Sequence, residues 1–172
     1  GKKFFNEEFG IKEQEILWLP DAFGFLGALP QIMKRSGIRY FLTTKMGWND
    51  ADQQPDDTFL WEGIDGSRVT GLYITTKNYE EKPVREVTYN GRQNASQTMG
   101  TWQNYRNKEL NDAVLTIYGY GDGGGGPTEG MLEESKRLSY GIPGVPKVKL
   151  SGLKEYLQVL DKNLQNKKLN TW

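Results

Sequence analysis

Two aspartates follow apolar runs of the sequence at positions where parallel α/β proteins place their catalytic groups. Asp21 comes directly after the run 16–19, and Asp122 lies four residues beyond the run 113–118. Ligands gather at the carboxyl ends of parallel strands, because the loops converge there and helix N-termini point at them. Two carboxylates suit glycoside hydrolysis, which needs one as the nucleophile and the other as the acid/base. Lys45 follows another run and would lie on the same rim. Each residue also has an ordinary alternative as a cap, a turn residue or a solvated lysine.

Short apolar runs alternate with helical stretches along the chain, which is typical of βα units around a mostly parallel sheet. The fold class predicted is therefore α/β. Asp65-Gly66, between the apolar stretches 58–64 and 67–74, predicts a β-hairpin, because this dipeptide suits a tight two-residue turn. The predicted core strands are 16–19, 40–44 and 113–118, with a further short strand at 148–150, and the predicted helices are 28–36, 95–109, 129–138 and one that starts at Ser151.

The glycine-rich stretch 119–126 matches the dinucleotide-binding pattern G-x-G-x-x-G between a strand and a helix. No acidic residue occurs in 142–150, where a ribose ligand is expected, and the loop is longer than the tight turn that a pyrophosphate needs. Nucleotide binding is the weaker interpretation. Consecutive glycines instead indicate backbone that approaches a ligand closely or folds over it.

The composition limits the partners. The 22 basic and 22 acidic residues cancel, so the sequence predicts no nucleic-acid partner and no membrane. Without cysteine, a reducing compartment is the default, and we expect a cytoplasmic protein. Aromatic residues make up 12 % of the chain and serve either as core residues or as surfaces for sugar rings. The chain opens on Gly1 without an initiator methionine and stops at Trp172, so we expect an internal piece of something longer.

Four blocks of the sequence are specific enough to compare with known families. The first reads Trp-Leu-Pro-Asp-Ala-Phe-Gly-Phe at 18–25 and continues to Ala-Leu-Pro-Gln-Ile at 28–32. The others are 40–50, 59–67 and 118–128. Together they resemble glycoside hydrolase family 38, the α-mannosidases, in the family's order, and they cover nearly the whole chain. The sequences of these blocks are nearer to those of the bacterial and cytosolic branch than to those of the Golgi branch. Residues 1–172 are thus expected to be a single fragment of the family's catalytic domain.

The resemblance implies a role for each matching residue. Asp21 corresponds to the nucleophile, which is also a zinc ligand, and Asp122 corresponds to the general acid/base. Lys45 falls where the family places a basic residue beside the nucleophile. The implied reaction is the retaining hydrolysis of terminal non-reducing α-D-mannose from oligosaccharides, with Zn²⁺ as cofactor. The candidates for lining the sugar site are Trp48, Trp61 and Tyr120.

One departure from the family pattern is that the chain contains no histidine. The resemblance implies a zinc ion held by two histidines and two aspartates, so this chain supplies one ligand of four, and we expect it to be inactive alone. The resemblance also implies a barrel-like domain of about seven parallel strands, roughly four of them here beside an inserted hairpin. Exposed strand edges would permit a homo-oligomer. The alternative function is a non-catalytic carbohydrate-binding module on the same fold.

Overall fold

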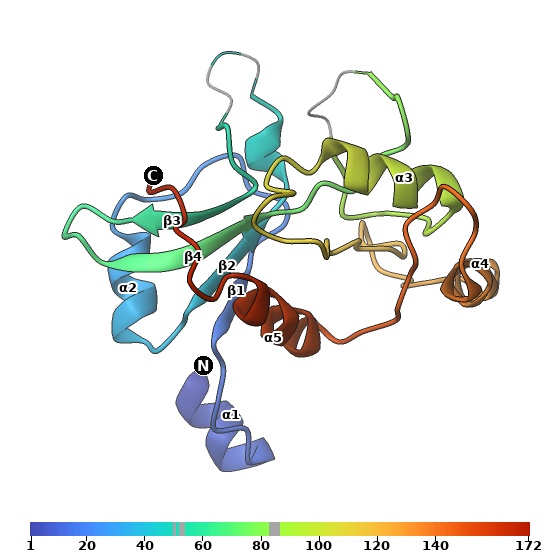
Figure 1. Ribbon diagram of the computed structural model, residues 1–172. Helices are drawn as coiled ribbons and strands as arrows, with labels where there is room; N and C mark the ends of the chain where they lie inside the picture. Colours follow the sequence, from blue (N-terminus) through green and yellow to red (C-terminus); the bar gives the residue numbers. More distant parts are fainter. Residues whose placement is uncertain (50, 52–53, 83–86) are drawn as a thin grey trace.

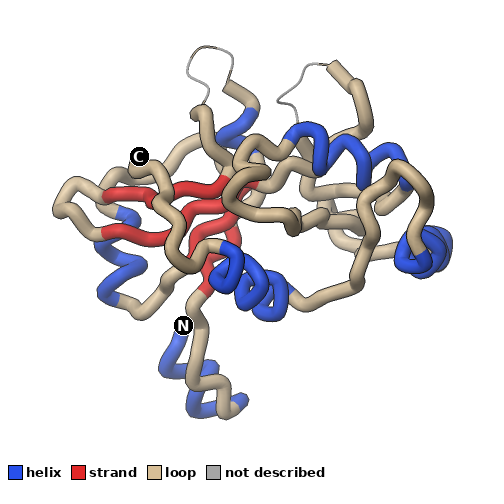
Figure 2. Tube along the Cα trace, viewed as in Figure 1, coloured by secondary structure: helices blue, strands red, loops and turns tan. Residues whose placement is uncertain are grey.

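The computed structural model describes residues 1–49, 51, 54–82 and 87–172. Figure 1 shows a small sheet with helices on both sides of it, and Figure 2 shows that long loops make up much of the chain between the helices. No helix in the described ranges is long and apolar enough to cross a membrane. The elements in chain order are α1 (Lys2–Phe9), β1 (Ile16–Trp18), α2 (Leu29–Arg35), β2 (Tyr40–Thr43), the 3₁₀ helix η1 (Lys45–Gly47), β3 (Thr58–Glu62), β4 (Arg68–Tyr73), α3 (Ala95–Asn104), α4 (Glu129–Tyr140) and α5 (Leu153–Asn163).

The sheet has the strand order β1-β2-β4-β3. β1, β2 and β4 run parallel, and β3 is antiparallel to β4. The predicted α/β class is therefore confirmed. The predicted hairpin forms as β3 and β4, but β4 is also a member of the parallel part of the sheet. The four strands include the hairpin, so fewer strands are parallel than predicted. The four-stranded sheet is open, and the barrel-like domain stays a prediction.

The hairpin turn is longer than the two-residue turn predicted from Asp65-Gly66. The Gly66 amide donates to the Gly63 carbonyl, and the Gly63 amide donates to the Ser67 carbonyl. Gly66 has φ +79°, a left-handed conformation that glycine adopts without strain. The Asp65 carboxylate accepts from the Ser67 amide at 3.0 Å, so Asp65 stabilises the loop rather than forming half of a tight turn.

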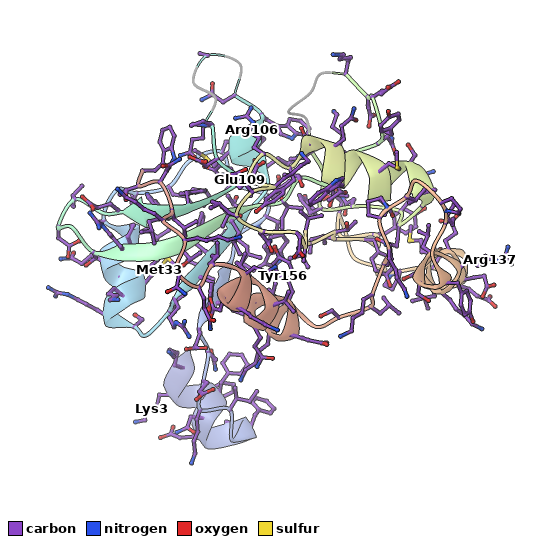
Figure 3. The ribbon with its side chains drawn as sticks, viewed as in Figure 1. Lys3, Met33, Arg106, Glu109, Arg137 and Tyr156 are labelled. Carbon is purple, nitrogen blue, oxygen red and sulfur yellow. The ribbon has the colours of Figure 1, made fainter. Side chains whose placement is uncertain are left out.

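Alternation along the strands sends side chains to two cores, one on each face of the sheet. α2 covers one face, where Met33 is 1 % exposed and packs with Phe41 and Val69. α5 covers the other face, where Leu157 and Leu160 are buried. Figure 3 shows Met33 and Tyr156 on these two helices. The second core comprises Tyr40, Leu42, Leu72, Ile74, Leu157 and Leu160, with Leu115, Ile117 and Tyr156 among the partly buried residues packed against it.

Two predicted strands do not form. The run 113–118 makes one isolated bridge, between Gly91 and Tyr118, and no ladder. Its apolar side chains Leu115 and Ile117 are instead packed against the α5 side of the sheet, and the Ile117 amide donates to the hydroxyl of Thr76. An apolar run predicts contact with the core, and here that contact forms without strand pairing. The stretch 148–150 is also not a strand, and Leu150 is 56 % exposed.

The helix predicted at 95–109 ends at Asn104 instead, while its predicted start is confirmed by Asn94, whose side chain accepts from the Gln97 amide. Tyr105 has ψ 126°, an extended conformation, and its hydroxyl lies 2.9 Å from that of Thr58. The Asn107 side chain oxygen accepts from the main chain of β3 at Thr58, at 2.9 Å. These contacts require extended chain after Asn104, which sequence periodicity cannot show. The helix α1 was not predicted at all.

The C-terminal residues cover the outer edge of β3. The Leu60 amide donates to the Asn170 carbonyl, and the Trp172 amide donates to the Leu60 carbonyl, both at 2.8 Å. The buried carboxylate of Asp56 accepts from the Asn170 side chain at 2.9 Å and from Asn107 at 2.6 Å. This edge of the sheet is therefore hydrogen-bonded, and the homo-oligomer stays a prediction.

At the start of β2, Tyr40 belongs to a charged cluster that is expected to make the stability of the fold depend on pH. The Tyr40 hydroxyl donates to Asp161 of α5 at 2.5 Å. Burial, followed by the hydrogen bond to Asp161, raises the pKa of Tyr40 above its ordinary value. In the unfolded chain tyrosine loses its proton at about pH 10. Above that pH the unfolded state releases a proton that the folded state retains, so the free energy of unfolding is expected to fall as pH rises.

Urea unfolding between pH 8 and 11 checks this expectation. Tyr40→Phe should make the alkaline loss of stability shallower. Tyr140→Phe is the control, because Tyr140 is 76 % exposed on α4. An unchanged slope in Tyr40→Phe would show that the Tyr40 hydroxyl does not contribute to the pH dependence.

Candidate active site

The parallel arrangement of β1 and β2 brings Asp21 and Lys45 together. Each follows its strand by a few residues, so both lie at the carboxyl edge of the sheet, as the sequence predicts. Lys45 Nζ is 3.9 Å from Asp21 Oδ1. The Asp21 side chain is 55 % exposed, while that of Lys45 is only 14 % exposed. The lysine thus places a largely covered positive charge beside a carboxylate that remains open to a ligand.

Tyr89 connects the two aspartates and was not predicted as a site residue. Its hydroxyl donates to Asp122 Oδ1 at 2.6 Å. Hydrogen bonding to Asp122, then burial and hydrogen bonding to Asp21, raise the pKa of Tyr89 above its ordinary value. Tyr89 therefore binds Asp122, lies close to Asp21 and remains protonated at neutral pH. Both aspartates have exposed side chains on the same rim, with neither buried against apolar packing.

Aromatic rings surround the ammonium group of Lys45. Its Nζ lies 3.7 Å from the centre of the Trp48 ring, 5.6 Å from that of Tyr89 and 5.9 Å from that of Phe23. These are cation–π distances. Phe23 and Trp48 pack edge to face and are 68 % and 42 % exposed. The indole of Trp48 donates to the Val87 carbonyl at 2.9 Å, which fixes its orientation. The rings leave an apolar surface next to the carboxylates.

The loop 119–126, here called the Asp122 loop, is closed at its base. Tyr120 and Gly126 exchange two main-chain hydrogen bonds of 2.8 Å each. Gly119 has φ +107°, and a Cβ there would lie 2.8 Å from the Pro127 nitrogen, so this position requires glycine. Tyr120 is 48 % exposed on this loop. Its role at the sugar site stays a prediction.

Trp61 lies away from this group of residues. It belongs to β3, and its ring packs 4.8 Å from Phe41 and 6.1 Å from Phe25, in the core on the α2 side. Of the residues predicted from the sequence, the structure brings together Asp21, Lys45, Trp48 and, through Tyr89, Asp122. Trp61 is not among the residues in contact with them, and its predicted role stays untested.

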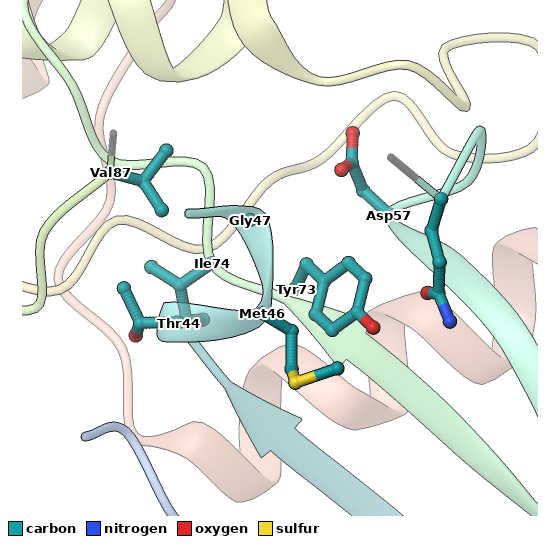
Figure 4. Close-up of a pocket in the computed structure, with 8 residues that line it drawn as sticks. Thr44, Met46, Gly47, Asp57, Tyr73, Ile74 and Val87 are labelled. Atoms are coloured by element: carbon teal, nitrogen blue, oxygen red, sulfur yellow. The ribbon is translucent and has the colours of Figure 1, made fainter. Parts of the chain in front are cut away.

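A small pocket lies next to η1 (Figure 4). Thr44, Met46 and Gly47 line one side, and Tyr73 and Ile74 at the end of β4 line another. Neither Asp21 nor Asp122 borders it. The pocket is therefore separate from the two aspartates.

A family model covers the whole chain and identifies its family. The model of the glycosyl hydrolases family 38 N-terminal domain matches residues 1–172, the whole chain. The chain belongs to glycosyl hydrolase family 38. This confirms the resemblance found in the four sequence blocks.

Relatives of this family 38 chain carry α-mannosidase names. Human "Alpha-mannosidase 2C1" is 40 % identical over 173 residues, which are 100 % of this chain and 15 % of the relative. The "Alpha-mannosidase" of Saccharomyces cerevisiae is 38 % identical over 138 residues, 80 % of this chain and 12 % of the relative. The family 38 chain therefore spans a small part of the length of these relatives.

A solved structure shares the fold of the family 38 chain. The crystal structure of an alpha-mannosidase from Enterococcus faecalis superposes with a TM-score of 0.61 over 96 % of this chain and 18 % of that protein, at 16 % identity. At this identity the likeness concerns the fold alone. It supports the mixed α/β arrangement of the family 38 chain.

The family resemblance implies zinc, and the donor set of this chain does not fit a zinc ion by itself. Within residues 1–49, 51, 54–82 and 87–172, no three His, Cys, Asp or Glu side chains gather closely enough to hold a metal. The charged side chain beside Asp21 is the cation Lys45. Catalytic zinc sites use at least three protein ligands. Asp21 alone cannot form the site.

Proposed function

We propose that the full-length protein hydrolyses terminal non-reducing α-D-mannose residues from oligosaccharides, with Asp21 and Asp122 as its catalytic carboxylates. Membership of family 38 and the α-mannosidase names of the relatives support this substrate class. The observation that carries the proposal is that both aspartates lie beside the same two side chains: Tyr89 donates to Asp122, and Lys45, which contacts the Tyr89 ring, lies 3.9 Å from Asp21. This arrangement places two exposed carboxylates at one site.

We propose that the reaction retains the configuration, as the family resemblance implies. Retaining glycosidases hold their carboxyl groups about 5 to 5.5 Å apart, whereas inverting ones leave about 6.5 to 9.5 Å for a water molecule. We therefore expect the shorter separation for Asp21 and Asp122. Asp21 would then act as a nucleophile rather than as a base for water.

In the first step, a carboxylate oxygen of Asp21 attacks the anomeric carbon of mannose. The bond from that carbon to the departing oxygen breaks, and protonated Asp122 gives its proton to this oxygen. The products are the free alcohol, a mannosyl ester of Asp21 and the carboxylate form of Asp122. The Tyr89 hydroxyl continues to donate to Asp122 Oδ1 and keeps its carboxyl group oriented.

In the second step, Asp122 takes a proton from water as the water oxygen attacks the anomeric carbon. The ester bond to Asp21 breaks and releases mannose with its original configuration. The positive charge of Lys45 lies 3.9 Å from Asp21, the group that must leave in this step. Sugar rings present apolar faces, and the exposed rings of Phe23 and Trp48 offer a surface for them.

Zinc enters the proposal as a cofactor of the full-length protein. Asp21 is proposed as one ligand, and the remaining ligands would come from outside this chain. Such an ion would polarise the mannose hydroxyls as a Lewis acid. The chain alone is expected to bind zinc weakly and to show no turnover. The full-length protein is proposed to be cytoplasmic.

An assay of the full-length protein with an aryl α-mannoside, with and without a chelator, tests this function. Activity is expected in the untreated protein and should disappear on chelation and return with Zn²⁺. The same assay separates the enzyme from a non-catalytic carbohydrate-binding module, which would bind mannosides without releasing phenol. Full activity after complete metal removal would contradict the zinc assignment.

A further inference from the structure

The residue after Tyr89 holds the main chain of the Asp122 loop. The Asn90 side chain oxygen accepts from the Gly121 amide at 2.6 Å and from the Asp122 amide at 3.3 Å. Tyr89 binds the carboxyl group of Asp122, and Asn90 binds its backbone. Two consecutive residues therefore fix both ends of the proposed acid/base.

Asn90 is itself held by the end of β4. The Asn90 amide donates to the Thr88 hydroxyl at 2.9 Å, and the Thr88 amide donates to the Thr76 carbonyl at 2.8 Å. Thr76 is fully buried just beyond β4. The Gly119 amide donates to the Gly91 carbonyl at 2.8 Å, which adds a second connection to the base of the loop. The segment 88–91 thus connects the end of the sheet to the Asp122 loop through hydrogen bonds.

The glycines at the junction fit this contact. A Cβ at Gly121 would lie 2.7 Å from the Asn90 side chain oxygen and would displace it. A Cβ at Gly91 would overlap the Ile117 carbonyl oxygen, so a side chain there would force the segment away from residue 117. The two stretches of chain approach each other closely because both positions lack a side chain.

We propose that Asn90 is a positioning residue that sets the place of the general acid/base Asp122. This inference rests on the proposed function and goes beyond it, because it assigns the position of the acid/base to an amide that touches no reacting atom. Its oxygen accepts from the two amides that lead into Asp122, whereas Tyr89 binds the carboxyl group and the Gly119–Gly91 hydrogen bond holds only the base of the loop. A displacement of about 1 Å in a catalytic group can cost about 100-fold in rate.

The position of a general acid affects the cleavage rate most for substrates whose leaving group must be protonated. A 2,4-dinitrophenolate leaves without protonation, whereas a phenolate or an alkoxide needs it. Loss of the Asn90 contact should therefore steepen the dependence of kcat/KM on the pKa of the leaving group. A purely structural defect would lower the amount of active enzyme and would therefore reduce the apparent kcat/KM equally for every substrate.

The test uses Asn90→Ala and Gly121→Ala in the full-length protein, with a series of aryl α-mannosides and methyl α-mannoside. Asn90→Ala removes the acceptor, and Gly121→Ala displaces it while Asn90 is retained. Both are expected to lose about 10- to 100-fold in kcat/KM on the poorest leaving group, less than the about 10²- to 10⁴-fold for complete loss of a general acid. Both should change little on the dinitrophenyl mannoside.

Asn94→Ala is the matched control. Asn94 lies four residues further along and caps α3, where it accepts from the Gln97 amide at 2.9 Å. The control should keep the leaving-group dependence of the unmodified protein. An equal loss on all substrates in Asn90→Ala, or no loss, would overturn the proposal. A steeper dependence in Gly121→Ala alone would also overturn it, because the effect would then belong to the loop and not to Asn90.

Failure of the proposed function would look different. The assignment of Asp122 fails, before Asn90 is considered, if the unmodified protein cleaves no aryl α-mannoside. It also fails if Asp122→Asn has the same leaving-group dependence as the unmodified protein. If Asp122→Asn behaves as an acid/base variant and Asn90→Ala does not, only the positioning role of Asn90 is wrong.

Discussion

Asp21→Asn in the full-length protein is expected to reduce kcat on aryl α-mannosides by at least about 10⁴-fold, the scale seen when an enzyme loses its nucleophile or the group that activates it. An amide oxygen does not form the mannosyl ester, and the change also removes the charge that faces Lys45 at 3.9 Å. Because the missing group is required for bond formation, the loss should be similar for good and poor leaving groups. Steady-state rates on two mannosides measure it.

Asp65→Asn is the matched control for this variant. Asp65 is also an exposed aspartate near a glycine, but its carboxylate binds Ser67 in the hairpin loop between β3 and β4. The control should retain the activity of the unmodified protein. Retention of most of the activity in Asp21→Asn would remove Asp21 from the mechanism, whatever the family pattern implies.

Asp122→Asn should give the second largest effect, with a different signature. Loss of a general acid costs about 10²- to 10⁴-fold, and the cost should be concentrated on substrates with poor leaving groups. Water attack on the mannosyl ester should also slow, since Asp122 is the proposed base. Tyr89→Phe removes the hydroxyl that binds Asp122 at 2.6 Å and is expected to give a milder form of the same pattern.

The measurement is the slope of log kcat/KM against leaving-group pKa, together with rescue by azide. Azide attacks the mannosyl ester without a base, so it should accelerate turnover of a dinitrophenyl mannoside in Asp122→Asn. Asp112→Asn serves as the control, because Asp112 binds Asn163 of α5 and lies outside the site. An unchanged slope and no azide effect would show that Asp122 is not the acid/base.

The sequence alone determined those parts of the site that depend on strand direction. Parallel strands carry the residues after them to the same edge, so apolar periodicity was enough to place Asp21 and Lys45 together. Local rules also determined where two helices start. Asn94 and Thr128 cap α3 and α4 through hydrogen bonds within three residues, and the apolar stripe of α5 packs on the sheet as predicted.

Tertiary contacts decided the rest. Tyr89 and Asn90 lie in a stretch without helix or strand, and their partners Asp122 and Gly121 are 33 and 31 residues away in the chain. The dipeptide Asn90-Gly91 is a turn signal, but no local pattern indicates which loop it holds. The same limit explains the strand predicted at 113–118. Its apolar residues correctly indicated packing against the core. Hydrogen-bond pairing, however, depends on which strands lie beside the run, and that is a property of the whole fold.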